Sequence, residues 1–246
     1  MRHSVKEIVF RAALLLPLAL VLGCAAQFDR RSTSVAASPG PTPAPTASPQ
    51  KQSDKIDRPA SEPYTGSLSQ FEDPKRDENL QPNRIMDVLG IKDGSRVADI
   101  GAGSGWFTVR AARRVGNNGA VYAVEINSDY LKHIEERAKR ENLPNIHTIL
   151  GKEDDPLLPA NSVDAVLLLK TYHEVAQPIR LLRRTREAMR AGALLGIIDR
   201  NGEAGSHGID KATLIEEVSR AGFVLVGEHD FVKPDNVDYF LVFRAK

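Results

Sequence analysis

The sequence predicts an α/β domain in which a doubly wound, mostly parallel β-sheet carries helices on both faces. Between Ser67 and Lys246, apolar runs of strand length alternate with segments of helical spacing, and this alternation is typical of parallel sheets with crossover helices. The nearly continuous apolar run Val163–Leu169 suits a strand that is buried on both faces. The length of this part of the chain suits a single domain.

Helices are expected at five places in this domain. Apolar residues recur at helical spacing over Arg76–Leu89, where Pro82 lies near the middle of one helix or marks a restart. Ser128 suits an N-cap, and Gly222 closes the last helix. The expected helices are Arg76–Leu89, Trp106–Val115, Asp129–Glu141, Pro178–Met189 and Lys211–Ala221.

Strands are expected where apolar runs are bounded by turn residues. Residues Lys92–Ser95 form a turn into the first strand, which ends near Asp99, and a turn near Pro234–Asn236 separates the last two strands. The other expected strands are Ala120–Ile126, Ile146–Leu150, Val163–Leu169, Ala193–Ile198, Phe223–Glu228 and Tyr239–Phe243.

Residues 1–24 have the character of an export signal. Basic residues precede a short apolar run over 12–23, which Pro17 interrupts and which is shorter than the roughly 20 residues needed to cross a bilayer. The ending Leu20–Cys24 resembles the lipobox of bacterial lipoproteins, which implies that Cys24 is lipidated and that the protein is anchored in the cell envelope. Cys24 is the only cysteine, so it cannot form an internal disulfide. An ordinary signal peptide or an uncleaved anchor is the alternative.

Residues 25–66 are predicted to form a disordered linker. They are rich in serine, threonine and alanine, contain a proline cluster at 39–49, and include almost no large apolar residue. Burial of such a segment cannot offset the entropy cost of ordering it. Its proline density indicates a semi-extended spacer, which would hold the domain over 67–246 away from a membrane surface.

A glycine-rich turn follows the first strand. Gly101, Gly103 and Gly105 come directly after Asp99, and glycine lets the backbone approach a ligand closely. The next helix offers free N–H groups and the positive end of its dipole at this point. Open α/β sheets bind ligands at the carboxyl ends of their strands, so the sequence predicts a cofactor site here.

The spacing of the glycines distinguishes two cofactors. The dinucleotide fingerprint G-x-G-x-x-G would place its third glycine where this chain has Trp106. The pattern of Asp99 followed by glycine at 101, 103 and 105 instead resembles motif I of the class I S-adenosylmethionine-dependent methyltransferases. Glu125 ends the next apolar run, about 20 residues on, where a carboxylate binds a ribose diol with either cofactor. An NAD-dependent oxidoreductase is therefore the weaker alternative.

The resemblance covers nearly all of Leu80–Phe243. It is closest to a bacterial group of small-molecule methyltransferases related to enzymes of quinone biosynthesis, which has similar blocks at 92–99, 158–164, 172–174 and 196–199. It implies a Rossmann-like sheet of seven strands, mostly parallel with an antiparallel last strand. It also implies S-adenosyl-L-methionine as the cofactor and a small molecule as the substrate.

The same resemblance assigns contacts to the cofactor. The glycine loop would lie against the methionine part, with Asp99 binding its amino group directly or through water. Glu125 would bind the ribose hydroxyls, and Ile126 would pack on the adenine face. An acid after the third strand would meet the adenine amine, and Asp154 is the first choice for it. Its neighbours Glu153 and Asp155 are the alternatives, and a solvated acidic turn is the ordinary interpretation of this cluster.

Polar residues follow the fourth strand, at the edge of the sheet where the transferred methyl group would point. Lys170 is expected at the cofactor, His173 suits a general base near neutral pH, and Tyr172 would orient a substrate oxygen. His173 could equally cap a strand or helix end through a backbone bond. Asp199 ends the fifth strand and faces the same cleft, and His207 would lie on a loop over the site or be merely solvated.

Charge and composition narrow the partners. The formal net charge of +1 is not the strong basic field of a nucleic-acid methylase, so no nucleic-acid partner is expected. No metal site is expected either, because the chain has no cysteine cluster and no paired-histidine spacing.

An exported domain would be separated from a methyl donor that is made in the cytosol. Three accounts stay open: an active enzyme with an exported or scavenged donor, a domain that stays in the cytosol because the signal is inefficient, or a noncatalytic envelope protein that binds a nucleoside-like ligand. The intact glycine motif argues against the last.

Overall fold

The computed structural model describes residues 54–56, 58–203, 205–232 and 236–246. The predicted signal segment 1–24 with Cys24, residues 25–53 of the predicted linker, and residues 234–235 of the predicted turn lie outside these ranges. Within the described ranges, no helix has the length and apolar character needed to cross a membrane.

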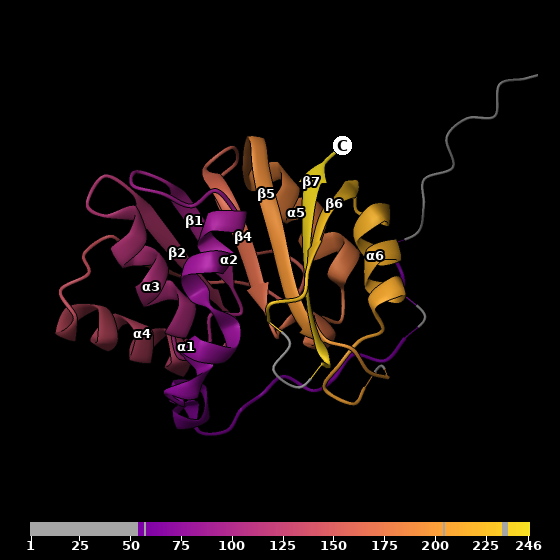
Figure 1. The fold of residues 1–246 in the computed structure, drawn as a ribbon, viewed down its shortest axis with the longest axis horizontal. Coiled ribbons are helices and arrows are strands. Elements are labelled where there is room, and N and C mark those ends of the chain that lie inside the picture. The colour runs from indigo at the N-terminus through magenta and orange to yellow at the C-terminus, as the bar shows by residue number, and fades with distance from the viewer. Residues whose placement is uncertain (1–53, 57, 204, 233–235) are drawn as a thin grey trace, which may run out of the picture. The chain divides into compact units, whose positions relative to one another are not determined.

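A seven-stranded sheet with the order β3-β2-β1-β4-β5-β7-β6 forms the centre of the domain (Figure 1). Neighbouring strands from β3 to β5 are parallel, whereas β7 is antiparallel to both β5 and β6. This arrangement confirms the predicted Rossmann-like sheet with an antiparallel last strand. The strands are β1 (Arg96–Ile100), β2 (Ala120–Glu125), β3 (Ile146–Leu150), β4 (Val163–Leu169), β5 (Met189–Arg200), β6 (Phe223–His229) and β7 (Asp238–Ala245).

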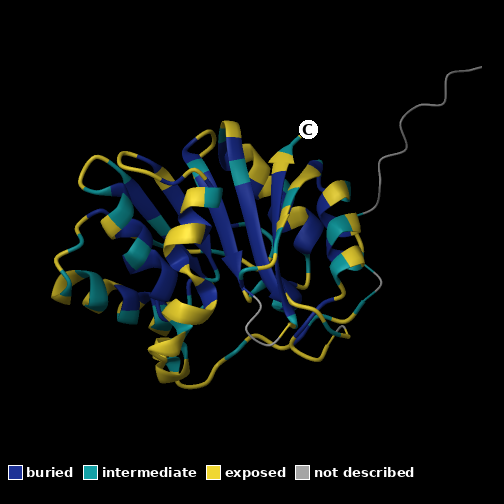
Figure 2. Ribbon diagram, in the orientation of Figure 1, coloured by how far each residue is buried: buried dark blue, intermediate teal, exposed yellow. Residues whose placement is uncertain are grey.

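Helices cover both faces of the sheet. Val97 of β1 packs in one core cluster with side chains of the first three helices, whereas its neighbour Ala98 packs in a second cluster with side chains of the last two. Successive residues of a strand point to opposite faces, and Figure 2 shows the strands buried between helices whose outer sides are exposed. The helices are α1 (Lys75–Leu80), α2 (Pro82–Val88), α3 (Trp106–Val115), α4 (Ser128–Arg140), α5 (Pro178–Ala188) and α6 (Lys211–Arg220), with the 3-10 turns η1 (Leu68–Glu72) and η2 (Tyr172–Glu174).

The sequence predicts one helix over Arg76–Leu89, with Pro82 in its middle or at a restart, and the structure has the restart. Helix α1 ends at Leu80, Gln81 adopts a left-handed conformation with φ +50°, and Pro82 begins α2. Proline suits the first position of a helix because its missing N–H would have no partner there, whereas inside a helix it would break a hydrogen bond.

Two other boundaries differ from the sequence prediction. The N-cap of α4 is Asn127 rather than Ser128, because the Asn127 side chain accepts the N–H of Asp129 at 2.9 Å. Strand β5 runs over Met189–Arg200, well beyond the expected Ala193–Ile198. Most of its extra length lies at its start, over residues 189–192, and its last two residues, Asp199 and Arg200, lie at the edge of the sheet where the cofactor site is predicted.

Part of the segment predicted as a linker packs against the domain. The guanidinium of Arg58 donates two hydrogen bonds to the carboxylate of Glu217 on α6, at 2.8 and 3.0 Å. Ser61 is buried, and its N–H donates to the carbonyl oxygen of His173 at 3.0 Å. We call residues 58–66 the strap. Polar contacts rather than apolar burial hold the strap, which explains why its composition indicates a linker while the domain begins earlier in the chain.

Candidate functional site

A cleft of about 1260 Å³ opens at the carboxyl ends of β1, β2, β4 and β5. The glycine loop after β1 (residues 101–104), the strap and the segments after β2 and β4 supply most of its walls. Because carboxyl ends of parallel strands meet at one edge of a sheet, this is where open α/β sheets bind ligands. The cleft lies at the edge predicted from the sequence.

The three glycines of the loop have different roles. Gly101 has φ +74°, and a Cβ atom there would lie 2.2 Å from Cγ2 of Thr171. Gly105 has φ +75°, precedes the first turn of α3, and would bring a Cβ atom to 3.1 Å from a side chain of α4. At Gly103, with φ +55°, the nearest atom to a Cβ would be 3.9 Å away, on Phe71. Gly101 and Gly105 therefore permit close packing, whereas Gly103 keeps the cleft side of the loop open.

Glu125 is fixed by backbone donors from its own loop and from the glycine loop. Its Oε2 accepts the N–H of Gly103 at 3.0 Å, and its Oε1 accepts those of Ile126 at 2.7 Å and Asn127 at 3.3 Å. Oε2 keeps a lone pair for a further donor. Ile126 lines the cleft with 44% of its surface exposed. A fixed carboxylate beside an exposed apolar side chain suits a ribose hydroxyl and a flat base.

Asp99 and Arg76 place opposite charges in the buried end of the cleft. Asp99 accepts a hydrogen bond of 2.6 Å from Thr108, and burial raises the pKa of Asp99 to about 6. Burial lowers the pKa of Arg76 to about 10, and its guanidinium lies over the ring of Trp106, 4.8 Å from the centroid. Sequence reasoning gave Arg76 no role, although it lies shortly before the glycine motif.

The acidic cluster after β3 is divided between the cleft and the surface. The carboxylate of Asp154, the preferred contact for the adenine amine, pairs with Arg180 of α5 at 2.8 Å, and Asp154 is not among the described residues that line the cleft. Glu153, one of the alternatives, does line it. The turn after β3 directs neighbouring side chains in different directions, which the sequence alone does not reveal.

Lys170, which the sequence placed at the cofactor, lines the cleft in a left-handed conformation with φ +54°. Its ammonium lies 2.6 Å from Oδ2 of Asp238, a residue that is almost fully buried. Much of the charge of Lys170 is therefore balanced within the protein rather than offered to a ligand.

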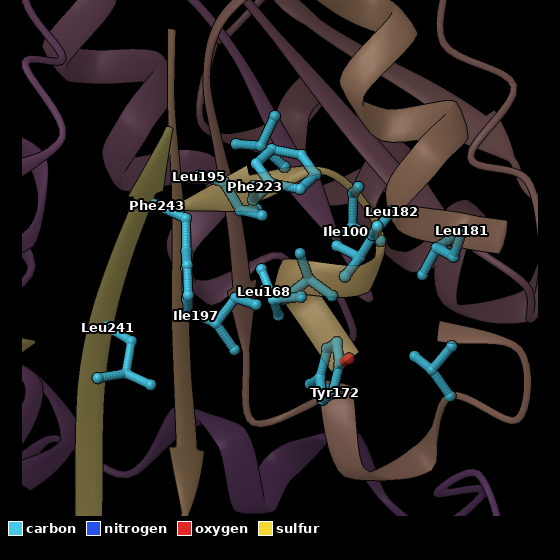
Figure 3. Close-up of a cluster of buried hydrophobic side chains, with 14 of the residues drawn as sticks. Ile100, Leu168, Tyr172, Leu181, Leu182, Leu195, Ile197, Phe223, Leu241 and Phe243 are labelled. Atoms are coloured by element: carbon cyan, nitrogen blue, oxygen red, sulfur yellow. The ribbon is translucent and has the colours of Figure 1, made fainter. Parts of the chain in front are cut away.

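Tyr172 does not orient a substrate, contrary to the sequence-based expectation. Its side chain is fully buried in the core between the sheet and α5, among Leu168 and Leu182 (Figure 3). Its hydroxyl donates to Glu217 at 2.9 Å, and burial raises its pKa well above the usual value. The short turn η2 directs consecutive side chains to opposite sides, so Tyr172 enters the core while His173 reaches the cleft.

His173 is oriented by Asp199 at the end of β5. Nδ1 of the ring lies 2.7 Å from Oδ1 of Asp199, whose Oδ2 accepts the backbone N–H of His173 at 3.0 Å. The Arg200 N–H also donates to Oδ1 of Asp199, at 2.8 Å. The Asp199 carboxylate therefore accepts from both backbone N–H groups, and we assign it as the acceptor toward the His173 ring as well. This network assigns the proton of a neutral His173 to Nδ1 and leaves the Nε2 lone pair unprotonated. Asp199 is thus a positioning residue for His173.

Two further side chains, those of Glu174 and His207, lie near the His173 ring. Oε1 of Glu174 lies 3.7 Å from Nε2 of His173, and burial raises the pKa of that carboxyl. The ring of His207 lies 6.0 Å from the His173 ring, centroid to centroid, at 86°. His207 thus takes the position over the site that the sequence offered as one of two possibilities, whereas Glu174 had no predicted role.

Residues 97–192 match a family model described as a methyltransferase domain. The match covers less than half of the chain. It begins in β1 and ends within β5, so it includes the glycine loop, Glu125 and His173.

Two curated relatives illustrate the similarity. The chain is 32% identical over 84 residues to aklanonic acid methyltransferase DauC from Streptomyces, covering 34% of this chain and 38% of that protein. It is 25% identical over 114 residues to demethylmenaquinone methyltransferase from Listeria welshimeri, covering 46% of this chain and 48% of that protein. The chain therefore spans less than half the length of these relatives.

Solved structures extend the comparison over most of the domain. A SAM-dependent methyltransferase from Aquifex aeolicus superposes with a TM-score of 0.66 at 23% identity, covering 72% of this chain and 95% of the other. The chain has the methyltransferase fold. The [4+2]-cyclase SpnF shares this fold, with a TM-score of 0.59 at 14% identity, covering 78% of this chain and 89% of its own. The solved structures confirm the predicted fold, and a fold alone does not determine the reaction.

Proposed function

We propose that this protein transfers a methyl group from S-adenosylmethionine to a small molecule. Glu125 carries the proposal. Its carboxylate is fixed by three backbone donors, one of them in the glycine loop, and Oε2 keeps a lone pair beside the exposed side chain of Ile126. This arrangement fits a ribose and an adenine at the end of β2.

The other end of the cleft fits the amino-acid part of the same cofactor. The buried carboxylate of Asp99 would hold the ammonium group, and the guanidinium of Arg76 would hold the carboxylate. Ser104 belongs to the glycine loop and lines the cleft. Its buried Oγ has no hydrogen-bond partner within the described part of the chain. A polar ligand would satisfy this oxygen, since buried polar atoms are rarely left without a partner.

The bound cofactor supplies an electrophilic methyl group on a sulfonium. A lone pair of the acceptor forms the bond to the methyl carbon as the carbon–sulfur bond breaks and its electron pair goes to sulfur. The walls of the cleft align the acceptor and exclude water. Where the acceptor carries a proton, Nε2 of His173 is placed to accept it, and Asp199 would stabilise the resulting imidazolium.

Calorimetry on the full chain in detergent tests the proposal. S-adenosylhomocysteine should bind and NAD should not. Glu125→Ala should weaken S-adenosylhomocysteine by about 1–3 kcal/mol, because a buried hydroxyl would lose its acceptor. Glu135→Ala, which removes an exposed carboxylate of α4, is the matched control and should bind normally. Binding of NAD alone, or equal affinity in the Glu125→Ala variant, would contradict the assignment.

We propose that the domain is exported and anchored to a membrane of the bacterial envelope through lipidated Cys24. The basic start, the short apolar run and the lipobox-like ending of residues 1–24 support this. Metabolic labelling with a fatty acid should label the wild-type protein and not Cys24→Ser. In spheroplasts, added protease should digest the domain. Labelling that survives Cys24→Ser, or a domain that protease reaches only after the inner membrane is broken, would overturn the exported-lipoprotein proposal. The second outcome would leave an ordinary cytosolic methyltransferase.

A further inference from the structure

We propose that His173, Glu174 and His207 form a binding site for a divalent transition-metal cation on the acceptor side of the cleft. One ligand atom from each residue lies within 4.8 Å of the other two. Two imidazoles and one carboxylate with open coordination positions suit ions such as Zn²⁺, Mn²⁺ or Fe²⁺. The residues come from η2 and from the loop after β5, so their spacing in the sequence did not indicate a metal site.

His173 already has the orientation of a ligand. Metal-binding histidines usually donate their second ring N–H to a carboxylate, which fixes the tautomer and turns the free nitrogen to the metal. Nδ1 of His173 has this partner in Asp199, at 2.7 Å. Nε2 is then the free nitrogen, and it lies 3.7 Å from Oε1 of Glu174.

The strap holds the third ligand in place. Ser61 donates its N–H to the carbonyl oxygen of His173 at 3.0 Å, and its Oγ accepts the N–H of His207 at 3.1 Å. A single buried serine therefore ties the two histidine-bearing segments together. His207 also has φ +55°, a conformation that is uncommon outside glycine and tends to occur at functional sites. A merely solvated loop histidine would need neither feature.

The distances suit a site that tightens around its ion. Bonds of about 2.1 Å place neighbouring ligand atoms about 3.0–3.4 Å apart. The 3.7 Å between His173 and Glu174 is close to this, and the spacings to His207, which are within 4.8 Å, narrow if the exposed His207 side chain rotates.

The open coordination positions would face the cleft, where the acceptor binds. A cation there would favour acceptors with two neighbouring oxygens, such as a hydroxyl beside a carbonyl or a second hydroxyl. It would lower the pKa of a bound hydroxyl, and it would occupy the Nε2 lone pair that otherwise serves as a base. This role toward the acceptor rests on the proposed methyl transfer, whereas the cation site itself rests only on the geometry above.

Titration of the full chain with Zn²⁺ after treatment with a chelator tests the site. Every protein carries Cys24→Ser, which removes the only thiol of the chain. One Zn²⁺ should bind, and Co²⁺ should give the absorption bands of a coordinated ion. His207→Ala and Glu174→Gln should each lower the affinity at least about tenfold. His133→Ala on α4, outside the described lining of the cleft, should bind Zn²⁺ as the parent does.

S-adenosylhomocysteine binding separates this proposal from the previous one. His207→Ala and Glu174→Gln should retain S-adenosylhomocysteine affinity, which also shows that they are folded. No saturable Zn²⁺ binding by the parent, or equal Zn²⁺ affinity in the parent and His207→Ala, would overturn the cation site. Zn²⁺ binding that depends on His207 in a protein that does not bind S-adenosylhomocysteine would leave the site standing and remove the proposed function.

Discussion

The cleft has a cofactor half around Glu125 and the glycine loop and an acceptor half around His173 and His207. Among the hydrogen bonds that hold these three side chains and their backbone, only the acceptor half draws on a contact from a distant part of the chain. In the cofactor half, Glu125 receives N–H donors from the next two residues and from Gly103, 22 positions away on the neighbouring strand's loop. In the acceptor half, His173 depends on Asp199, 26 positions away, and His207 depends on Ser61, 146 positions away. A short sequence motif marks the cofactor half, whereas no motif marks the acceptor half, whose His207 is held by Ser61 of the strap.

The largest effect we expect concerns the strap, whose Ser61 ties together the segments that carry His173 and His207. Arg58→Met should lower the free energy of unfolding by up to about 3–5 kcal/mol, because it leaves the buried carboxylate of Glu217 without its cation. Urea denaturation followed by circular dichroism measures this change. Adding Glu217→Gln to Arg58→Met should recover part of the loss. If the strap did not contribute to stability, both variants would be as stable as the wild type, and this result would contradict the prediction.

Gly103→Val tests the cofactor half. We expect it to abolish detectable binding of S-adenosylhomocysteine, because its branched side chain would stand in the cleft and its positive φ disfavours any side chain. Gly90→Val is the matched control: Gly90 also has a positive φ, +68°, and a Cβ there would meet nothing within 4 Å. Both variants should lose a similar amount of stability, and only Gly103→Val should lose binding. Equal binding by the two would remove the glycine loop from the site.

Asp99 should make ligand binding and stability respond to pH in opposite directions. Burial raises its pKa from 3.8 to about 6, so between these values the folded protein holds a proton that the unfolded chain releases. The free energy of unfolding should therefore fall as pH rises from 4 to 6, to the extent that Asp99 controls it. Under the proposed function the ionised carboxylate of Asp99 holds the ammonium group of S-adenosylhomocysteine, so affinity should rise as pH passes 6.

Measurements on Asp99→Asn isolate this contribution. Calorimetry at pH 5 and pH 7 should give a smaller pH dependence of affinity for Asp99→Asn than for the wild type. Urea denaturation at the same pH values should show that the free energy of unfolding of Asp99→Asn falls less with rising pH than that of the wild type. An unchanged pH dependence of affinity would show that Asp99 does not contact the ammonium group.

The same contrast explains what the sequence could and could not predict. Periodicity located every strand of the sheet, and the glycine motif with Glu125 at the end of the next strand located the cofactor half, because both are patterns of residue types along the chain. Tyr172 and His173 are adjacent, and no local pattern tells that one fills the core while the other reaches the cleft. The strap was missed because hydrogen bonds to distant residues order it, and these leave no mark on composition.

The smallest effect we expect separates Asp154 from Glu153. Asp154→Ala removes an ion pair with Arg180, whose side chain is half exposed, and such pairs contribute about 0–1 kcal/mol to stability. Because Asp154 does not line the described part of the cleft, affinity for S-adenosylhomocysteine should change less than twofold. Glu153→Ala should weaken binding by a few fold, since Glu153 lines the cleft and under the proposed function would accept from the adenine amine. Calorimetry on both variants decides between them. The reverse order of effects would return the adenine contact to Asp154 and would mean that the turn after β3 rearranges when the cofactor binds.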